Sequence, residues 1–130
     1  MFIEMPAHHV IDIANRIVLT VFTGVLTMHD VVENTEKLHS DAAFDPTFSE
    51  LIDFTAVSDI ELDPSELRTL HKRDPFSTVS KRALVVGLPN SIYGAAQMYR
   101  MMRANEVCVG IFHTITEASR WLGSNSRTAP

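Results

Sequence analysis

The sequence predicts an α/β domain, with a mixed β-sheet and helical crossovers in the order β-β-α-β-α-β-α-β-α. Two observations predict it. The apolar residues switch repeatedly between the alternation of a strand and the wider spacing of a helix. After the first two strands, strands and helices alternate, which is typical of parallel strands joined by helices. The chain has 130 residues, 45% of them hydrophobic, and can therefore bury a core. We expect a single domain over residues 1–123 and a flexible C-terminal tail over residues 124–130.

The N-terminal segment predicts a hairpin followed by a helix. Residues 10–13 and 16–22 are rich in β-branched and apolar side chains and are separated by two residues, which predicts an antiparallel hairpin. Thr27 with Asp30 three places later matches a capping box, and apolar residues continue at helical spacing as far as Leu38. We therefore expect the first helix to begin directly after Thr27.

The centre of the chain predicts a strand, an acidic loop and a second helix. Residues 51–55 form a short apolar strand, and the acidic residues that follow Val57 predict a loop. Asp63 then stands at the N-cap position, with Pro64 at the first helical position and Glu66 at the third. This combination specifies a helix that starts after Asp63.

The C-terminal half predicts two further strands, each followed by a helix. Residues 82–86 and 107–112 are the strands, and residues 91–105 form the longest predicted helix. The last helix is expected to begin after Thr114 and to end at Gly123.

Charge and cysteine content exclude several classes of function. The net charge of −5 opposes nucleic-acid binding, and the densest basic cluster, residues 71–74 with Lys81 and Arg82, is expected on a solvated face. Cys108 is the only cysteine, so the chain has no disulfide framework. No stretch approaches the roughly 18 apolar residues of a membrane span. We expect a cytoplasmic protein that binds no nucleic acid, has no membrane span and needs no cofactor.

Four segments, taken in order, resemble the STAS-like proteins, which have the fold of the bacterial anti-sigma factor antagonists and include the uncharacterised SpoIIAA-like proteins. The segments are RIVLTVFTGVLTMHD (residues 16–30), LIDFTAVSDI (51–60), KRALVVGLPNSIYG (81–94) and GIFHTITEASRWL (110–122). The resemblance covers most of the chain. It implies a STAS-like sheet and a non-enzymatic role in regulation through protein–protein interaction.

In the antagonists, a motif of the type D-S-S-G-L follows the central strand, and its second serine is phosphorylated by a partner kinase. Without a gap Asp63 falls at that position, whereas two extra loop residues bring Ser65 there. Pro64 then replaces the first serine and Glu66 replaces the glycine. A phosphate on Ser65 would lie beside two acids, which repel it. We therefore interpret Asp63 and Ser65 as a helix start, and the phosphoswitch as degenerate.

Residues at the carboxyl ends of parallel strands gather at one edge of a sheet, so a second candidate site lies there. Its members are Ser58, Asp59, Ser91, His113 and Thr114. Helix starts at this edge could bind an anion, but they also serve as ordinary caps, and the acids disfavour a free anion.

The residues also suggest a hydrolase and a metal site as two further interpretations. A hydrolase would combine Ser65 or Ser91, His71 or His113, and Asp53, but no G-x-S-x-G motif supports it. The histidines lack H-x-x-x-H spacing, so we predict neither a metal site nor a catalytic set.

The long helix over residues 91–105 carries a broad apolar stripe that is either core or contact surface. The candidate interface or ligand residues are Ile92, Tyr93, Met98, Tyr99, Met101 and Met102.

We therefore expect a non-enzymatic STAS-like regulatory or protein-interaction domain that forms a homodimer and binds a protein partner of unknown identity. The alternative is a protein that binds a lipid or an apolar anion between the sheet and the helix that carries Tyr93, Tyr99 and Met102. A hydrolase-type enzyme is the third interpretation.

Overall fold

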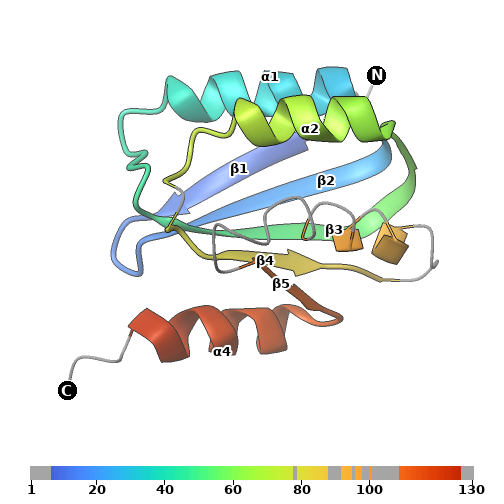
Figure 1. Cartoon of the computed structure of the whole chain (residues 1–130). Coiled ribbons are helices and arrows are strands. Elements are labelled where there is room, and N and C mark those ends of the chain that lie inside the picture. Colours follow the sequence, from blue (N-terminus) through green and yellow to red (C-terminus); the bar gives the residue numbers. More distant parts are fainter. Residues whose placement is uncertain are drawn as a thin grey trace, which may run out of the picture.

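A computed structural model describes residues 7–77, 79–87, 92–94, 96, 97, 100 and 109–126. These residues form a five-stranded sheet with helices on both faces (Figure 1). The elements are β1 (Ala7–Asp12), β2 (Ile17–Thr27), α1 (Met28–His39), β3 (Ser49–Glu61), α2 (Pro64–Lys72), β4 (Arg82–Val85), β5 (Val109–Phe112) and α4 (Ile115–Ser126). Between β4 and β5, residues 92–94, 96, 97 and 100 are helical. The predicted α/β class and its mixed sheet are confirmed.

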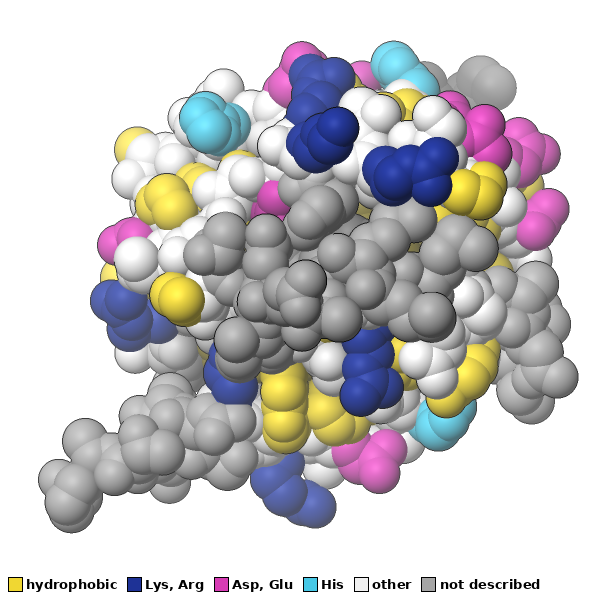
Figure 2. All heavy atoms as spheres, in the orientation of Figure 1, with side chains coloured by type: hydrophobic (Ala, Val, Ile, Leu, Met, Phe, Trp, Pro, Cys, Tyr) yellow, Lys and Arg dark blue, Asp and Glu magenta, His cyan; other side chains and the backbone are white. Residues whose placement is uncertain are grey.

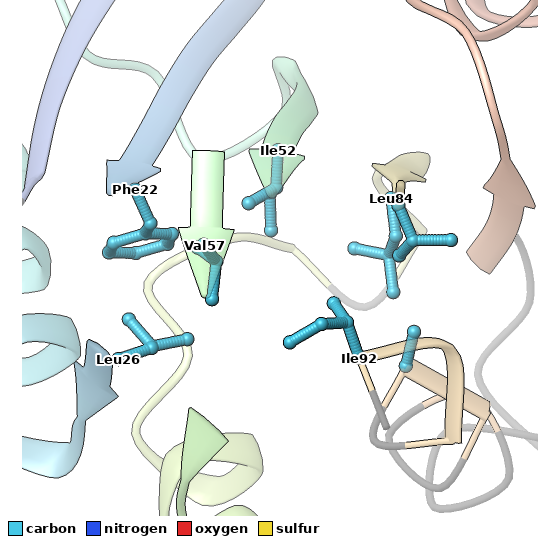
Figure 3. Close-up of a cluster of buried hydrophobic side chains, with 8 residues drawn as sticks. Phe22, Leu26, Ile52, Val57, Leu84 and Ile92 are labelled. Atoms are coloured by element: carbon cyan, nitrogen blue, oxygen red, sulfur yellow. The ribbon is translucent and has the colours of Figure 1, made fainter. Parts of the chain in front are cut away.

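The strands lie in the order β1-β2-β3-β4-β5, with β1 antiparallel to β2 and the other pairs parallel. Helices α1 and α2 cover one face of the sheet and α4 covers the other (Figure 1). Because side chains alternate along a strand, neighbouring residues serve different cores. Ile52 packs with Leu84 and Ile92 beneath the crossover helices (Figure 3), whereas Leu51 packs with Leu122 of α4.

The predicted hairpin is present, but its strands differ in length from the prediction. Residues 13–16 form the turn between β1 and β2, and Arg16 adopts a left-handed φ of 58°. The Asp12 carboxylate accepts hydrogen bonds from the Asn15 side chain (2.7 Å) and backbone N–H (3.1 Å). These bonds lower the pKa of Asp12 below its ordinary value. The turn is thus an Asx-type turn, which aspartate and asparagine favour.

The acidic loop predicted after Val57 is wrong, because β3 continues as a strand to Glu61. This extension pairs with the second half of β2, and the register shifts twice, between Val21 and Thr23 and between Gly24 and Val25. β4 pairs with β3 only as far as Asp53, so the two-stranded extension projects beyond the sheet. Acidic side chains are tolerated there because they point into water.

The helix starts predicted after Thr27, Asp63 and Thr114 are correct, and the start predicted at Ser91 lies outside the described residues. Thr27 and Asp30 form a capping box on α1, and Asp63 and Glu66 form one on α2. Thr114 Oγ1 accepts a hydrogen bond from the backbone N–H of Glu117 at 3.1 Å, which caps α4. The predicted end of that helix is wrong, because α4 continues past Gly123 to Ser126.

Candidate functional site

A cavity of about 140 Å³ lies between the sheet and the helices α1 and α2. Its apolar lining includes Phe22, Leu26, Ile52, Leu67, Leu84 and Ile92. Five of these six also belong to the core cluster drawn in Figure 3, where side chains from β2, β3, β4 and the segment around Ile92 converge. The cavity is therefore a space within the main core, lined largely by aliphatic and aromatic side chains.

A buried polar network lies at the edge of this cavity and joins three strands. Thr20 of β2, Glu50 of β3 and Arg82 of β4 are all buried, and Glu50 and Arg82 stand opposite each other in the parallel pair. Thr20 Oγ1 donates to Glu50 Oε2 at 2.7 Å, and Arg82 Nη1 lies 3.4 Å from Glu50 Oε1. These groups are fixed by the regular sheet register, so the network is rigid.

Arg82 also contacts the loop that follows α2. Its Nη2 donates to Asp74 Oδ1, and its guanidinium carbon lies 4.2 Å from the ring centroid of Phe76. Asp74 Oδ1 additionally accepts from the Phe76 backbone N–H at 3.0 Å. The expectation that Arg82 lies on a solvated face is wrong, since its side chain is only 3% exposed. Its carboxylate partners offset the cost of burying the charge.

Asn34 of α1 is another buried polar residue in the lining of the cavity. It is 6% exposed, and its Oδ1 accepts no hydrogen bond from any described residue. Buried polar atoms are paired in the great majority of cases, so an unpaired acceptor needs an explanation. The oxygen itself has almost no accessible surface, so other atoms of Asn34 face the open space of the cavity.

Charges of both signs surround the polar end of the cavity. Glu50 and Asp74 carry two carboxylates, and Arg82 carries one guanidinium. At the molecular surface, acidic and basic side chains are interspersed over the face that Figure 2 shows. Within the described parts of the chain, no three histidine, cysteine or acidic residues are placed to hold a metal ion.

Two predicted site residues come together, His113 from the strand ends and Tyr93 from the candidate interface of the long helix. Their rings stack with centroids 6.0 Å apart, and His113 Nδ1 lies 3.3 Å from the Val86 carbonyl oxygen. The Tyr93 hydroxyl accepts a hydrogen bond from Gln97 Nε2 at 2.7 Å. Both rings are therefore engaged in contacts between the strand ends and the helical segment.

The other predicted residues of this edge have local roles. Asp63 Oδ1 accepts from the Glu66 backbone N–H at 2.8 Å, and the Asp59 carboxylate accepts from the backbone N–H of Ile60. Ser58 and Ser65 are exposed. Across the described ranges, no hydrogen bond or ion pair joins Ser58, Asp59 or Ser65 to His113.

The hydrolase residues do not form a described triad. Asp53 Oδ1 accepts from the backbone N–H and the hydroxyl of Thr55, at 2.9 and 2.6 Å, and so stabilises its own strand. The His71 side chain and Ser91 lie outside the described residues, as do Met98, Tyr99, Met101 and Met102. Ile92 is 1% exposed and lines the cavity.

Sequence reasoning missed the polar network and Asn34. A signal for Arg82 existed, because it stands two residues before Leu84 and four before Val86, on the same strand face as these core residues. A charged residue on a core-facing position predicts a buried pair. Asn34 had no comparable signal, since asparagine in a helix is usually exposed.

Comparison with known structures identifies the fold. The chain aligns with the crystal structure of an uncharacterised protein of the DUF3478 family from Shewanella loihica PV-4, which is described as having a SpoIIAA-like fold. The TM-score is 0.63 at 18% sequence identity, over 94% of this chain and 98% of the other. This chain has the SpoIIAA-like fold. The STAS-like resemblance inferred from the four sequence segments is thus confirmed at the level of fold. No protein-family model matches the chain, and no curated protein matches it.

Among the residues that the structure describes, none of the helices combines the length and the hydropathy that crossing a bilayer requires.

Proposed function

We propose that this SpoIIAA-like domain is a non-enzymatic module that binds a small, largely apolar ligand in the cavity beneath α1 and α2. The observation that carries the proposal is the cavity itself, which lies between the sheet and the helices and is lined largely by apolar side chains. Small-molecule sites are concave and mostly apolar, with a few polar groups in the lining. The sequence placed the pocket of the ligand-binding alternative against the helix that carries Tyr93, Tyr99 and Met102, whereas the cavity lies beneath α1 and α2 and Tyr93 does not line it.

The cavity volume sets the size of the ligand. An apolar cavity of about 150 Å³ is large enough to bind benzene, and this one measures about 140 Å³. A single ring or a short alkyl chain therefore fits, whereas a complete membrane lipid does not. The expected ligand is a small ring compound or the end of a longer apolar molecule that projects through the rim.

Titration with toluene, followed by amide chemical shifts, tests the proposal. Ala96 is buried and lines the cavity, so Ala96→Leu fills part of it and should weaken toluene binding at least tenfold. Ala56→Leu makes the same change on the exposed part of β3 and should leave the affinity unchanged. Toluene binding that is equal in wild type and Ala96→Leu would show that the cavity is not the site.

A second candidate function, assembly through protein–protein contact, is favoured by the edge strand β1. Helix α4 packs on β3, β4 and β5, and within the described parts of the chain it does not extend over the corresponding face of β1. On that face Val10 is 58% exposed, between His8 and Asp12, which are also exposed. Edge strands of this kind can pair with a second chain.

The occupant that fits this edge is a second copy of the chain. An antiparallel pair of β1 strands centred on Val10 would place valine opposite valine. It would also place His8 opposite Asp12 of the partner subunit, twice by symmetry. The expected homodimer is measured by light scattering during gel filtration. Val10→Lys should give a monomer, whereas Ile115→Lys, an exposed change on α4, should not. A wild-type monomer at high micromolar concentration would contradict this candidate.

We further propose that regulation does not act through phosphorylation of Ser65. The Asp63 and Glu66 carboxylates flank this position and already satisfy the helix start. Intact-mass measurement of the protein from its native host should find Ser65 unmodified under varied growth conditions. A mass increase of one phosphate that Ser65→Ala abolishes would restore the phosphoswitch.

A further inference from the structure

We infer that the ligand of this cavity carries a hydrogen-bond acceptor, such as a carbonyl or ether oxygen, and that the side-chain amide nitrogen of Asn34 donates to it. The inference rests on the proposed ligand-binding function and adds the chemical class of the ligand. Two observations support it. The accessible part of the Asn34 amide is its nitrogen, and the face of α1 that carries Asn34 forms a wall of the cavity.

The first observation concerns the two polar atoms of the Asn34 side chain. The residue is 6% exposed, and its Oδ1 has almost no accessible surface. Nδ2 forms no hydrogen bond with any described residue, and yet it is not among the unpaired polar atoms that are fully inaccessible. The accessible polar surface of the amide therefore belongs to its nitrogen, which has two N–H groups and no acceptor for them.

The second observation is the side of α1 on which Asn34 lies. Residues three and four apart share one face of a helix, and Val31, Asn34 and Leu38 all line the cavity. Glu33 and Lys37 lie on the other side of the helix and are exposed to solvent. The accessible surface of Asn34 is therefore part of the cavity wall, and its N–H groups are available to a ligand in that space.

A donor without a partner in an apolar cavity favours a ligand that supplies the missing acceptor. A buried amide has lost its hydrogen bonds to water, and an acceptor on the ligand replaces one of them. A purely apolar ligand leaves the amide unpaired. A ring or a short chain that carries a carbonyl, ether or nitrile is therefore expected to bind more tightly than a hydrocarbon of the same shape.

Benzonitrile and phenylacetylene are suitable probes because they have nearly the same shape. Each carries a linear two-atom group on one ring, which ends in an acceptor nitrogen in benzonitrile and in a C–H group in phenylacetylene. Their affinities for wild type and for Asn34→Leu can be measured by titration followed by amide chemical shifts. Asn34→Leu keeps the side-chain size nearly constant and removes the donor. Circular dichroism checks that each variant is folded.

The expected result is a change in preference and not only in affinity. The ratio of benzonitrile to phenylacetylene affinity should be about fivefold higher in wild type than in Asn34→Leu, the effect of one hydrogen bond. Val31→Ala changes another residue of the same wall without changing the amide. It should shift both affinities together and leave their ratio unchanged. If Asn34→Leu does not fold, Asn34→Ala removes the same donor and is measured instead.

The other results separate the inference from the proposed function. A ratio that Asn34→Leu does not change, with both probes still bound, would overturn the inference and leave the proposed function intact. A ratio that Val31→Ala lowers as much as Asn34→Leu does would also overturn the inference, since the preference would then come from packing. If neither probe binds wild type at millimolar concentration, the proposed function fails and the inference fails with it.

Discussion

Replacing Arg82 with methionine should strongly destabilise the fold, because it removes the guanidinium that pairs with two buried carboxylates. The Glu50 and Asp74 side chains are each 8% exposed. At the 3.4 Å separation of Arg82 Nη1 and Glu50 Oε1, Coulomb attraction at an effective dielectric constant of about 20 is about 5 kcal/mol. Removing one partner of such a buried pair typically costs about 3–5 kcal/mol of unfolding free energy. We expect a loss in that range for Arg82→Met.

The loss of unfolding free energy should come from the Glu50 and Asp74 charges that Arg82 no longer pairs with, and not from the missing guanidinium itself. The triple variant Arg82→Met, Glu50→Gln, Asp74→Asn removes all three charges and should recover more than half of the lost free energy. Part of the loss would remain, since the stacking of Arg82 on Phe76 is also removed. The triple variant separates the two contributions because it keeps the side-chain volumes nearly constant.

Urea denaturation followed by circular dichroism measures both variants. The midpoint should fall for Arg82→Met while the slope stays constant, and it should rise again in the triple variant. A loss below about 1 kcal/mol for Arg82→Met, or a triple variant less stable than Arg82→Met, would refute the reasoning. Either result would mean that water reaches Glu50 and Asp74 and solvates their charges.

Three further predictions concern the cap of α2, the dependence of stability on pH in acid, and Gly110 in the edge strand β5. Asp63→Ala should cost about 1 kcal/mol in urea denaturation by removing the cap of α2, whereas Ser65→Ala should change stability by less than about 0.5 kcal/mol. The Ala43 N–H and His9 lower the pKa of Asp41 below its ordinary 3.8, so its stabilisation is present above that pH and lost as the pH falls below it. Asp41→Asn should reduce the fall in unfolding free energy as the pH is lowered, and an unchanged pH dependence would contradict the prediction. Gly110→Ala would place a Cβ 2.8 Å from the Phe112 ring and should cost about 1–3 kcal/mol, and an unshifted urea midpoint would disprove the clash.

The fold was predictable because its signals are local and repeated. The capping boxes at Thr27 and Asp63 depend on side chains three residues apart, and the structure contains both. The extension of β3 was not predictable in the same way. Its residues 57–61 are mostly exposed, and they are held as a strand by pairing with residues 24–27 of β2, far away in sequence. Only the tertiary partner distinguishes this strand from a loop.

The candidate site was less predictable than the fold, for a related reason. Glu50, Asp74 and Arg82 come from three separate segments, and their meeting depends on the register of β3 against β4. The strand position of Arg82 indicates burial but not its partners, and Asp74, in a turn before Pro75, is consistent with an exposed position. The sequence predicted candidate sites at the exposed helix starts because Ser, Thr and Asp at these positions are typical of both caps and binding sites. In the structure Asp63 and Thr114 cap their helices, and the unpaired polar group lies instead on α1 at Asn34.

The unpaired acceptor of Asn34 has an energetic cost that a stability measurement can detect. Its Oδ1 is buried and accepts no hydrogen bond from any described residue. An unpaired buried acceptor costs about 1–3 kcal/mol. A leucine at position 34 would remove that cost at nearly constant side-chain size, and Asn34→Leu is therefore expected to stabilise the protein and to raise the urea midpoint. A lower midpoint for Asn34→Leu would show that the amide contributes more to stability than its unpaired oxygen costs.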